Sequence, residues 1–422
     1  MFGLVDCNNF YCSCKRVFQN QLQGKPLIVL SNNDGCAIAR SEEAKALGVQ
    51  MGENYHELYP LIKRHNIQVR SSNYTLYDNM SGRVMRTIGR FVPNLEVYSI
   101  DEAFIDLFGM ARHHNLEQLC QTIRGTIGQN QNIPVCIGVA PTKTLAKLAN
   151  HYAKKVCREE GVYVANTPEK IQAMLEWAPL KEVWGLGKQY CKLLTGYGYH
   201  TAAQLLAAPE DFVRKHLTVV GARLLNELKG IACIPWEYEE ADKKGICSSR
   251  SFGKMMNEKK YVQHAVAEFA SRVAEKLRLQ GSVTKKIHVF VNTNPHRADH
   301  AQHHQGVTYE LLMAASDTPT LVKAALTALD MIWRDNFWYM KAAVMATDVC
   351  SKDAVQTSLW EPPDKSKLNA AMAALDGINK TYFKHMVRIA SMGPAAKAYE
   401  TRHAHLSKCY TTRLSDVLTT SF

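Results

Sequence analysis

The sequence predicts a multidomain α+β protein, and three observations lead to that fold class. The 422 residues exceed what one hydrophobic core usually organises, so about two to four domains are expected. Hydrophobic residues make up 46% and charged residues 21% of the chain, which is typical of globular rather than disordered proteins. Strand patterns alternate with helix patterns in residues 1–165 and again in residues 244–350, whereas residues 166–236 are helical in pattern.

Strands are expected where short apolar runs suit burial on both faces of a sheet. In the first part these runs are MFGLVD (1–6), PLIVLSNN (26–33) and PVCIG (134–138). The segment LEVYSIDEAFIDL has strand-like flanks around Asp101 and Glu102, which predicts a hairpin with an acidic tip. Helices are expected at residues 41–47, closed by Gly48, and at 142–154, where apolar residues recur at helical spacing.

The rest of the chain divides into a helical part, a linker, a second α+β part and a tail. The helical part contains two glycine-bearing turns, WGLGKQ and TGYGYHT, and the charged stretch at 237–243 predicts a linker. In the second α+β part, helices are expected at 262–279 and 318–333, the latter with Thr318 as N-cap and Pro319 at the first helical position. Strands are expected at SSRSFG, at KKIHVFVNT and near residues 341–349. The tail from residue 351 is less regular, with a helix-prone stretch at 367–375.

The net charge of +12 is unevenly distributed along the chain. Residues 1–72 and 73–165 carry +2 each, and residues 166–243 carry −1. Residues 244–350 carry +5 and the tail carries +4. This excess favours a polyanionic partner, either nucleic acid or an acidic membrane surface. No apolar run approaches the ~18 residues that a membrane span needs, and the N-terminal run is too short for a signal peptide, so a cytoplasmic protein is expected.

Cysteine and histidine patterns favour neither disulfides nor zinc. The twelve cysteines include no C-x-x-C pair, which favours small apolar fillers in a reducing compartment. Four histidines, His296, His300, His303 and His304, lie in the polar stretch NPHRADHAQHH. Their irregular spacing favours a solvated loop over a metal site.

The sequence also predicts a cluster of three carboxylates. Asp6 ends a buried strand, and Asp101 and Glu102 occupy the tip of the predicted hairpin. If these strands are neighbours, the three carboxylates meet at one edge of the sheet and need a cation, for which oxygen ligands select Mg²⁺ or Mn²⁺. Two such ions support nucleotidyl transfer. The alternative is a solvated hairpin tip beside one strand-end aspartate.

Several short motifs in a fixed order connect this chain with a known family: DCNNFYCSC, SNNDGCAIAR, SSNYTLYDNMS, YSIDEAFIDL, GVAPTKTLAKLAN, VWGLG and CSSRSFG. With them the sequence resembles the Y-family, or lesion-bypass, DNA polymerases over nearly its whole length. Within that family it is most similar to the branch that contains the catalytic subunit of bacterial DNA polymerase V and its mobile-element homologues.

The resemblance implies a right-hand polymerase with a ferredoxin-like palm, small fingers, a helical thumb and an α+β little finger. The implied domains are a palm (1–10 and 73–165), fingers (11–72), a thumb with a helix-hairpin-helix (166–236), a linker (237–243), a little finger (244–350) and a C-terminal partner-binding region (351–422).

The resemblance also implies roles for the carboxylates. Asp6, Asp101 and Glu102 match the catalytic metal ligands of the palm, with the backbone carbonyl of Cys7 as a further ligand. The implied cofactor is a pair of Mg²⁺ ions, with Mn²⁺ as a substitute, that would serve attack of a primer 3′-hydroxyl on the α-phosphate of a deoxynucleoside triphosphate.

Nucleotide contacts are implied on both sides of the carboxylates. Tyr11 matches the family's steric gate against a 2′-hydroxyl, Phe10 a turn at the triphosphate, and Lys154 a lysine on the triphosphate. The alternatives are an aromatic core residue for Tyr11 and a solvated helix-end lysine for Lys154. Many relatives carry a Tyr and an Arg in the fingers where this chain has Glu42 and Lys45. Lys45 offers a point charge, and Arg40 is a candidate substitute, although a solvated helix face is the alternative.

DNA and clamp contacts are implied in the later domains. Gly185 and Gly187 match the thumb's helix-hairpin-helix, in which backbone amides approach phosphates. Arg250, Ser251 and Lys254 lie in the most basic part of the implied little finger and are expected to contact the DNA backbone. The tail peptide containing Gln356, Leu359 and Trp360 resembles the motif by which bacterial polymerases bind the sliding clamp, with docking back onto the parent chain as the alternative.

The implied function is error-prone, template-directed translesion DNA synthesis in the SOS DNA-damage response, without a proofreading domain. The implied partners are primer–template DNA, deoxynucleoside triphosphates, a UmuD′-type dimer, RecA and the sliding clamp, and no membrane. The implied location is the cytoplasm, with nucleoid association in the active state. Two rival functions are a nucleotidyl cyclase, for which the expected GGDEF-like turn is absent, and a non-catalytic DNA-binding subunit, which has no need of all three carboxylates.

Overall fold

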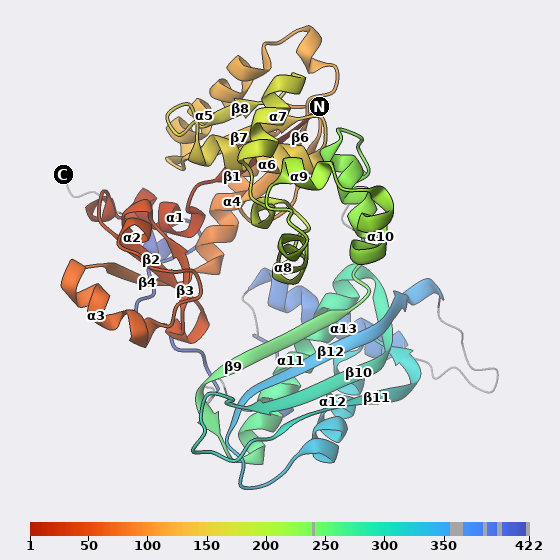
Figure 1. The fold of residues 1–422 in the computed structure, drawn as a ribbon. Helices are drawn as coiled ribbons and strands as arrows, with labels where there is room; N and C mark the ends of the chain where they lie inside the picture. The colour runs from red at the N-terminus through yellow and green to blue at the C-terminus, as the bar shows by residue number, and fades with distance from the viewer. Residues whose placement is uncertain (239–240, 355–365, 383–385, 395–398, 419–422) are drawn as a thin grey trace. The chain divides into compact units, whose positions relative to one another are not determined.

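The computed structural model describes residues 1–238, 241–354, 366–382, 386–394 and 399–418 (Figure 1). The chain forms two compact units, here called unit 1 and unit 2. Unit 1 comprises Met1–Glu239 together with Ala404–Phe422, and unit 2 comprises Glu240–His403.

Unit 1 is organised around a five-stranded sheet in the order β5-β6-β1-β7-β8. Its strands are β1 (Phe2–Cys7), β5 (Leu95–Val97), β6 (Glu102–Asp106), β7 (Val135–Ala140) and β8 (Val162–Val164). The predicted first strand is central, because β1 pairs antiparallel with both β6 and β7. The helices are α4 (Tyr74–Ile88), α5 (Leu116–Gln131) and α6 (Lys143–Lys155). The order β1-α4-β5-β6-α5-β7 is the βαββαβ connection of ferredoxin-like folds, so the predicted palm fold is confirmed.

The alternation of β1 explains the two layers of helices that cover this sheet. Val5 points into the core formed with α4 and α5, and its neighbour Leu4 points into the core formed with α6. Thr142 is the N-cap of α6, and its hydroxyl accepts a hydrogen bond from Leu145 N. It packs closely on β7 because Gly138 has no side chain: a Cβ there would overlap backbone atoms of α6.

The predicted fingers segment forms a three-stranded sheet in the order β3-β2-β4. Its strands are β2 (Leu27–Leu30), β3 (Ala37–Arg40) and β4 (Gln68–Ser71), and its helices are α1 (Phe10–Phe18), α2 (Glu42–Ala46) and α3 (Tyr55–His65). Two of these elements, β2 and the short helix before Gly48, follow the sequence prediction. Helix α1 starts directly after β1 because Asn9 adopts a left-handed conformation with φ of 48°.

The segment with a helical pattern is helical in the structure. It contains α7 (Pro168–Trp177), α8 (Lys188–Gly196), α9 (Ala202–Leu206) and α10 (Glu210–Leu228). These helices share a hydrophobic core with α6. The turn before α8 depends on Gly185, whose φ of 95° is strained for other residues.

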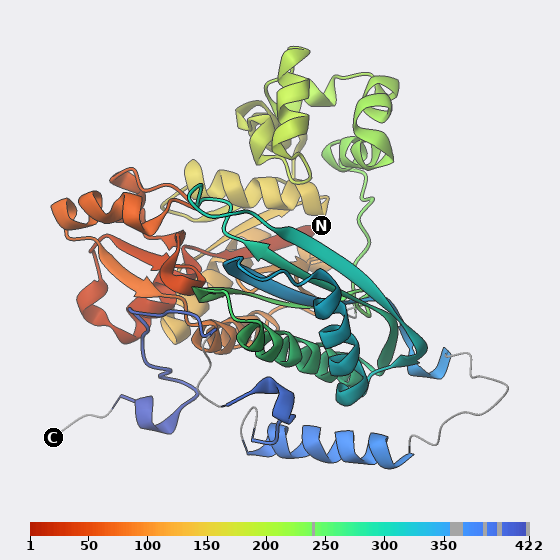
Figure 2. The same cartoon turned by 90° about the horizontal axis from the view of Figure 1, so that it is seen from below.

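Unit 2 is a four-stranded antiparallel sheet in the order β11-β10-β12-β9. Its strands are β9 (Ile246–Met256), β10 (Ser282–Thr293), β11 (His304–Ala315) and β12 (Tyr339–Ser351). Helices α11 (Lys259–Gln280) and α12 (Thr318–Ile332) pack side by side on one face of the sheet (Figures 1 and 2). Both predicted helices and all three predicted strands are therefore present, and β11 is an additional strand.

Two local predictions in unit 2 need correction. The N-cap of α12 is Asp317, whose carboxylate accepts a hydrogen bond from Thr320 N at 2.9 Å, and Thr318 lies one position inside the helix. The histidine stretch is not wholly a solvated loop, since β11 begins at His304. Its neighbour His303 is buried and lies 2.9 Å from the hydroxyl of Tyr339.

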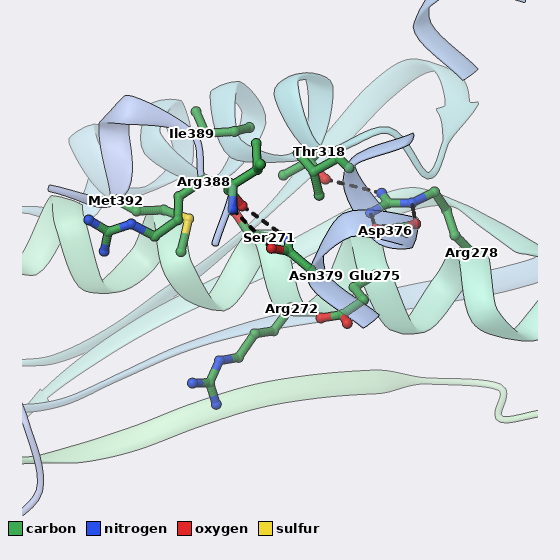
Figure 3. Close-up of a pocket in the computed structure, with 12 residues that line it drawn as sticks. Ser271, Arg272, Glu275, Arg278, Thr318, Asp376, Asn379, Arg388, Ile389 and Met392 are labelled. Carbon is green, nitrogen blue, oxygen red and sulfur yellow. Dashed lines mark hydrogen bonds and ion pairs between the residues drawn. The ribbon is translucent and has the colours of Figure 1, made fainter. Parts of the chain in front are cut away.

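The C-terminal region is not one separate tail, in contrast to the prediction. Helix α13 (Ser366–Thr381) packs against unit 2, where Arg278 of α11 makes two 2.7 Å hydrogen bonds to the Asp376 carboxylate (Figure 3). Met392 and Tyr399 are buried in the core of unit 2. From Ala404 onward the chain belongs to unit 1.

Arg278→Met is expected to release α13 from unit 2. The paired charges are largely buried, and loss of the arginine leaves the Asp376 carboxylate without its two charge-assisted bonds, at a cost of about 2 kcal/mol. Amide exchange in α13 should then rise at least tenfold while α11 stays protected. Arg388→Met is the matched control, because Arg388 lines the same small cavity but among the described residues bonds only to the Pro394 carbonyl, at 3.3 Å. Unchanged exchange in α13 would contradict this prediction.

Candidate active site

The three predicted carboxylates lie at one edge of the five-stranded sheet. Asp6 is near the end of β1 and pairs in register with Glu102, the first residue of β6. Asp101 precedes Glu102 in the connection from β5, and its carbonyl accepts a hydrogen bond from Cys7 N at 2.9 Å. The Ser99 hydroxyl donates to Asp101 Oδ1 at 2.7 Å and accepts from Glu102 N at 3.0 Å, which fixes the turn. The predicted convergence of the strands is therefore correct.

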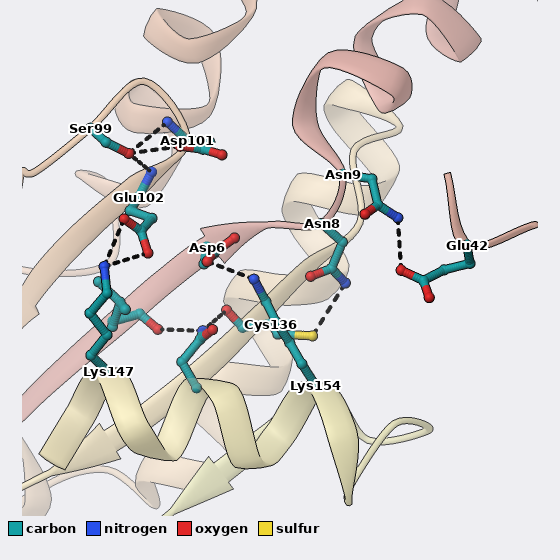
Figure 4. A network of polar contacts seen from close by, with 12 residues as sticks. Asp6, Asn8, Asn9, Glu42, Ser99, Asp101, Glu102, Cys136, Lys147 and Lys154 are labelled. Carbon is teal, nitrogen blue, oxygen red and sulfur yellow. Dashed lines mark hydrogen bonds and ion pairs between the residues drawn. The ribbon is translucent and has the colours of Figure 1, made fainter. Parts of the chain in front are cut away.

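Two lysines of α6 reach the carboxylates. Lys154 Nζ lies 2.6 Å from Asp6 Oδ2, and Lys147 Nζ lies 2.8 and 2.9 Å from the two oxygens of Glu102 (Figure 4). The lysines are seven residues apart, so they share one face of the helix. Lys147 was not predicted, although its spacing from Lys154 was visible in the sequence. Its ammonium also lies 4.6 Å from the ring centroid of Tyr98, which adds a cation–π contact.

The electrostatics of this edge follow from burial and like charge. Burial raises the pKa of Asp6 to about 6. The opposite charge of Lys154 counteracts this effect, while the negative charges of Glu102 and Asp101 add to it. Three ionised carboxylates at this partly buried edge repel one another, and cations lower that repulsion.

The donor set fits a hard divalent cation in its chemistry. The predicted ligands Asp6, Asp101, Glu102 and the carbonyl of Cys7 all offer oxygen, which Mg²⁺ and Mn²⁺ prefer. In the part of the chain that the structure describes, however, no three His, Cys, Asp or Glu side chains converge closely enough to hold an ion. The carboxylates of Asp6 and Glu102 instead take lysine ammonium groups as counter-charges.

A cavity of about 380 Å³ opens between this edge and the predicted fingers. Its wall brings together two of the predicted metal-binding carboxylates, the predicted backbone ligand and all five predicted nucleotide-binding residues. The lining residues are Asp6, Cys7, Asn9, Phe10, Tyr11, Ile38, Ala39, Arg40, Lys45, Met51, Asp101 and Lys154. Glu102 does not line the cavity.

Tyr11 is held in the cavity wall by two other tyrosines. Its ring stacks on Tyr77 with centroids 4.2 Å apart and an interplanar angle of 13°. The edge of Tyr74 approaches it at 6.0 Å. Tyr77 is fully buried, as is most of Phe10 beside it. The Tyr11 ring therefore packs on a buried aromatic ring and also lines the cavity.

The predicted fingers segment supplies positive charge to the cavity wall through Arg40 and Lys45. Lys45 Nζ lies 2.6 Å from both Glu42 Oε1 and Asn9 Oδ1. Burial alone would raise the pKa of Glu42, but these hydrogen-bond partners hold it below its usual value. Arg40 donates from Nη1 to the Val49 carbonyl at 2.8 Å, and its buried Nε has no hydrogen-bond partner among the described residues. Arg40 thus lines the cavity and has a side-chain donor that no described residue engages.

The predicted DNA-binding residues occupy different environments. No atom lies within 4 Å of a Cβ placed on Gly185 or Gly187, so their backbone is open to approach. Lys254 is exposed on β9. Arg250 instead lies 4.0 Å from the buried Glu268 carboxylate of α11.

Ser251 lies on the sheet face opposite the helices. It pairs in register with Lys341, whose ammonium lies 5.7 Å from the ring centroid of Phe290, whereas the neighbours Val289 and Val291 face the helices. This face of the sheet was not part of the prediction. The predicted clamp-binding residues Gln356, Leu359 and Trp360 lie outside the described residues. None of the described helices is long and apolar enough to cross a membrane.

Comparison with known protein families identifies three regions of the chain. Residues 5–151 match the impB/mucB/samB family, and residues 243–359 match the C-terminal domain of the same family. Residues 369–419 match a domain of unknown function.

Comparison with individual proteins agrees with these family matches. UmuC of Salmonella typhimurium is 39% identical over 420 residues, which cover 99% of each chain. DNA polymerase IV 1 of Bacillus subtilis is 26% identical and covers 68% of this chain and 69% of the relative. A solved Y-family DNA polymerase chimera has the same fold, with a TM-score of 0.68 over 83% of this chain and 100% of the other, at 19% identity. This chain therefore belongs to the impB/mucB/samB family of Y-family DNA polymerases.

Proposed function

We propose that this chain, a Y-family translesion DNA polymerase, adds deoxyribonucleotides to a primer 3′-hydroxyl in the cavity between the carboxylate edge and the fingers. One observation carries the proposal: the cavity wall combines Asp6 and Asp101 with Tyr11, Arg40 and Lys154. A nucleoside triphosphate needs the same combination, namely a counter-charged reaction centre, a surface for the sugar and cations for the phosphates.

The carboxylates would hold two Mg²⁺ ions, for which Mn²⁺ could substitute. When bound, these ions lower the pKa of an attacking hydroxyl and neutralise charge on the phosphates. Asp6 and Asp101 lie on the cavity wall, and Glu102 pairs with Asp6 across the two strands. To hold an ion, Asp6 would have to exchange its 2.6 Å contact with Lys154, whose ammonium would then be available to the triphosphate.

The remaining wall residues orient the substrate. Tyr11 presents a supported ring where a sugar would lie, and this ring leaves no room for a 2′-hydroxyl. Arg40 and Lys45 lie on the fingers side of the same cavity and are proposed to bind phosphate oxygens. The backbone of Phe10 continues from β1 into α1 and completes the turn at the triphosphate.

The proposed partners follow from the relatives. Similarity to UmuC over 99% of both chains supports a UmuD′-type dimer as an accessory subunit. Primer–template DNA is the proposed polyanion for the basic second part of the chain. RecA, the sliding clamp and a cytoplasmic, nucleoid-associated location remain proposals that rest on the family.

Primer extension tests the proposed function. Purified protein with Mg²⁺, a primed template, deoxynucleoside triphosphates, clamp and accessory dimer is expected to extend the primer past an abasic site. Absence of any nucleotide addition under these conditions would contradict the proposal and leave a non-catalytic DNA-binding subunit. Release of a cyclic nucleotide without primer would instead indicate a cyclase.

Lys254→Ala combined with Lys341→Ala is expected to weaken DNA binding across sequences and to lower the slope of log affinity against log salt by about 2. Each lysine would otherwise neutralise one phosphate. Arg250 is left unchanged because it lies beside the buried Glu268. Lys323→Ala is the matched control, since Lys323 is exposed on α12, which covers the sheet face opposite to that of Lys341. Salt titrations of fluorescence anisotropy measure the slope, and an unchanged slope in the double variant contradicts the assignment.

A further inference from the structure

Residues Ala404–Asp416, here called the C-terminal strap, are bound along the predicted fingers segment. Ala404 N donates to Asp34 Oδ2 at 2.7 Å. The carbonyl of His405 accepts from Ser71 N, and His405 N donates to the Ser71 hydroxyl, each at 3.0 Å. The strap lies within the region that matches a domain of unknown function. Its contacts therefore suggest what this part of that domain does.

The strap is also fixed to the start of α4. Asn73 caps α4 by accepting from Leu76 N with its side-chain oxygen. Its side-chain amide donates to the carbonyls of Ser407 and Lys408 at 3.1 and 3.2 Å. Because α4 carries Tyr74 and Tyr77, the strap is held at the helix that supports Tyr11.

A direct chain of contacts joins the strap to the cavity. The Ser407 hydroxyl accepts a hydrogen bond from Lys15 Nζ at 2.6 Å. The same ammonium lies 5.1 Å from the ring centroid of Tyr77. Tyr77 in turn stacks on Tyr11 at 4.2 Å. Lys15 and Tyr77 thus connect Ser407 with Tyr11 in the cavity wall.

Lys15 is an unusual residue in this position. It is fully buried, and no carboxylate lies within ion-pair distance of it among the described residues. Burial lowers the pKa of Lys15 to about 8. An apolar side chain of the same length would avoid this desolvation cost, so the ammonium is not explained by stability alone.

The hydroxyl of Tyr77 does not fix the position of its ring. It is buried and has no hydrogen-bond partner among the described residues. The ring is therefore placed by its packing partners, of which Lys15 approaches from the side of the strap and Tyr11 from the side of the cavity.

We propose that the C-terminal strap positions Tyr11 through Ser407, Lys15 and Tyr77, and thereby contributes to the selection of deoxyribonucleotides over ribonucleotides. The inference rests on the proposed role of Tyr11 in that selection. Ser407 and Lys15 are positioning residues, since neither lines the cavity. Loss of the Ser407 hydroxyl leaves the ammonium free to shift, and the Tyr77 ring and the stacked Tyr11 ring shift with it.

The test compares two variants that each remove one hydroxyl from the strap. Ser407→Ala is expected to lower the ratio of kcat/KM for a deoxyribonucleotide over its ribonucleotide roughly fivefold, which corresponds to about 1 kcal/mol. Thr411→Val should keep the wild-type ratio, because the Thr411 hydroxyl is buried without a hydrogen-bond partner among the described residues. Ser407→Thr retains the hydroxyl and should also keep the ratio.

Lys15→Met provides a second route to the same result if Ser407→Ala folds poorly, since it removes the ammonium and preserves the volume. A lowered selectivity ratio in either variant supports the inference, because a purely structural role would reduce the use of both nucleotides alike. An unchanged ratio in both variants, beside increased ribonucleotide use in Tyr11→Ala, overturns the inference and leaves the proposed function intact. An unchanged ratio in Tyr11→Ala itself overturns the role of Tyr11 and the inference with it.

Discussion

Asp101→Asn is expected to lower the rate of primer extension roughly a thousandfold at saturating Mg²⁺. The substitution keeps the size of the side chain and removes the charge that the proposed ions require. Its amide oxygen can still accept the hydrogen bond that Ser99 donates at 2.7 Å, so the turn before β6 should survive. Single-turnover extension of a primed template measures the effect.

Asp101 is the most informative of the three carboxylates to change. Asp6 and Glu102 are bonded to Lys154 and Lys147, so neutralising either would also leave a partly buried ammonium without its partner. No ion pair of Asp101 occurs among the described residues, which separates loss of charge from loss of packing. Asp106→Asn is the control. It replaces an aspartate by asparagine at the other end of β6, and Asp106 does not line the cavity.

The outcome separates two explanations of the acidic edge. If Asp101→Asn binds primed DNA normally but extends it a thousandfold more slowly, the carboxylate acts in the reaction. If this variant extends primers as fast as the wild type, the metal assignment is contradicted, and Asp6 and Glu102 would serve only to pair with the lysines of α6.

The sequence predicted the parts of the site that depend on local pattern. An apolar run followed by one aspartate located β1 and Asp6, and strand-like flanks around Asp101 and Glu102 located the β5–β6 hairpin. Both patterns depend on only a few neighbouring residues, because strand burial and hairpin turns are local properties.

The missed features depend on contacts between distant residues. Lys147 reaches Glu102 only because α6 crosses the sheet at one register, which the sequence of the helix does not encode. The bond between Lys15 and Ser407 joins positions 392 residues apart, and the strap itself has no periodic pattern. Edge strand β11 was missed because most of its residues are exposed or half-buried, so it lacks a clear alternation.

The orientation of Arg250 shows a different limit. A basic residue in a strand pattern is expected to face solvent, yet Arg250 pairs in register with the buried Ala342, and its guanidinium lies 4.0 Å from the Glu268 carboxylate. Which basic residues of β9 face solvent depends on contacts with other elements, here the contact of Arg250 with Glu268 of α11. The DNA-binding assignment accordingly depends more on Lys254 and Lys341.

Tyr11→Ala is expected to raise the efficiency of ribonucleotide incorporation roughly a hundredfold relative to deoxyribonucleotide incorporation. Removing the ring opens the cavity wall where a sugar would lie, and the stacked Tyr77 behind it is fully buried and cannot move forward to replace it without leaving its core. Use of deoxyribonucleotides should not rise, because their contact with the ring is lost and no clash is relieved.

Tyr11→Phe distinguishes the ring from its hydroxyl. Phenylalanine preserves the stack on Tyr77 and the edge contact with Tyr74, so this variant should discriminate as the wild type does. Single-nucleotide insertion with each ribonucleotide and its deoxy counterpart gives both ratios. Equal ratios in Tyr11→Ala and Tyr11→Phe would contradict a steric role, and a loss of discrimination in Tyr11→Phe alone would assign it to a hydrogen bond from the hydroxyl. The expected pattern, loss with alanine and retention with phenylalanine, follows only if the supported ring itself excludes the 2′-hydroxyl.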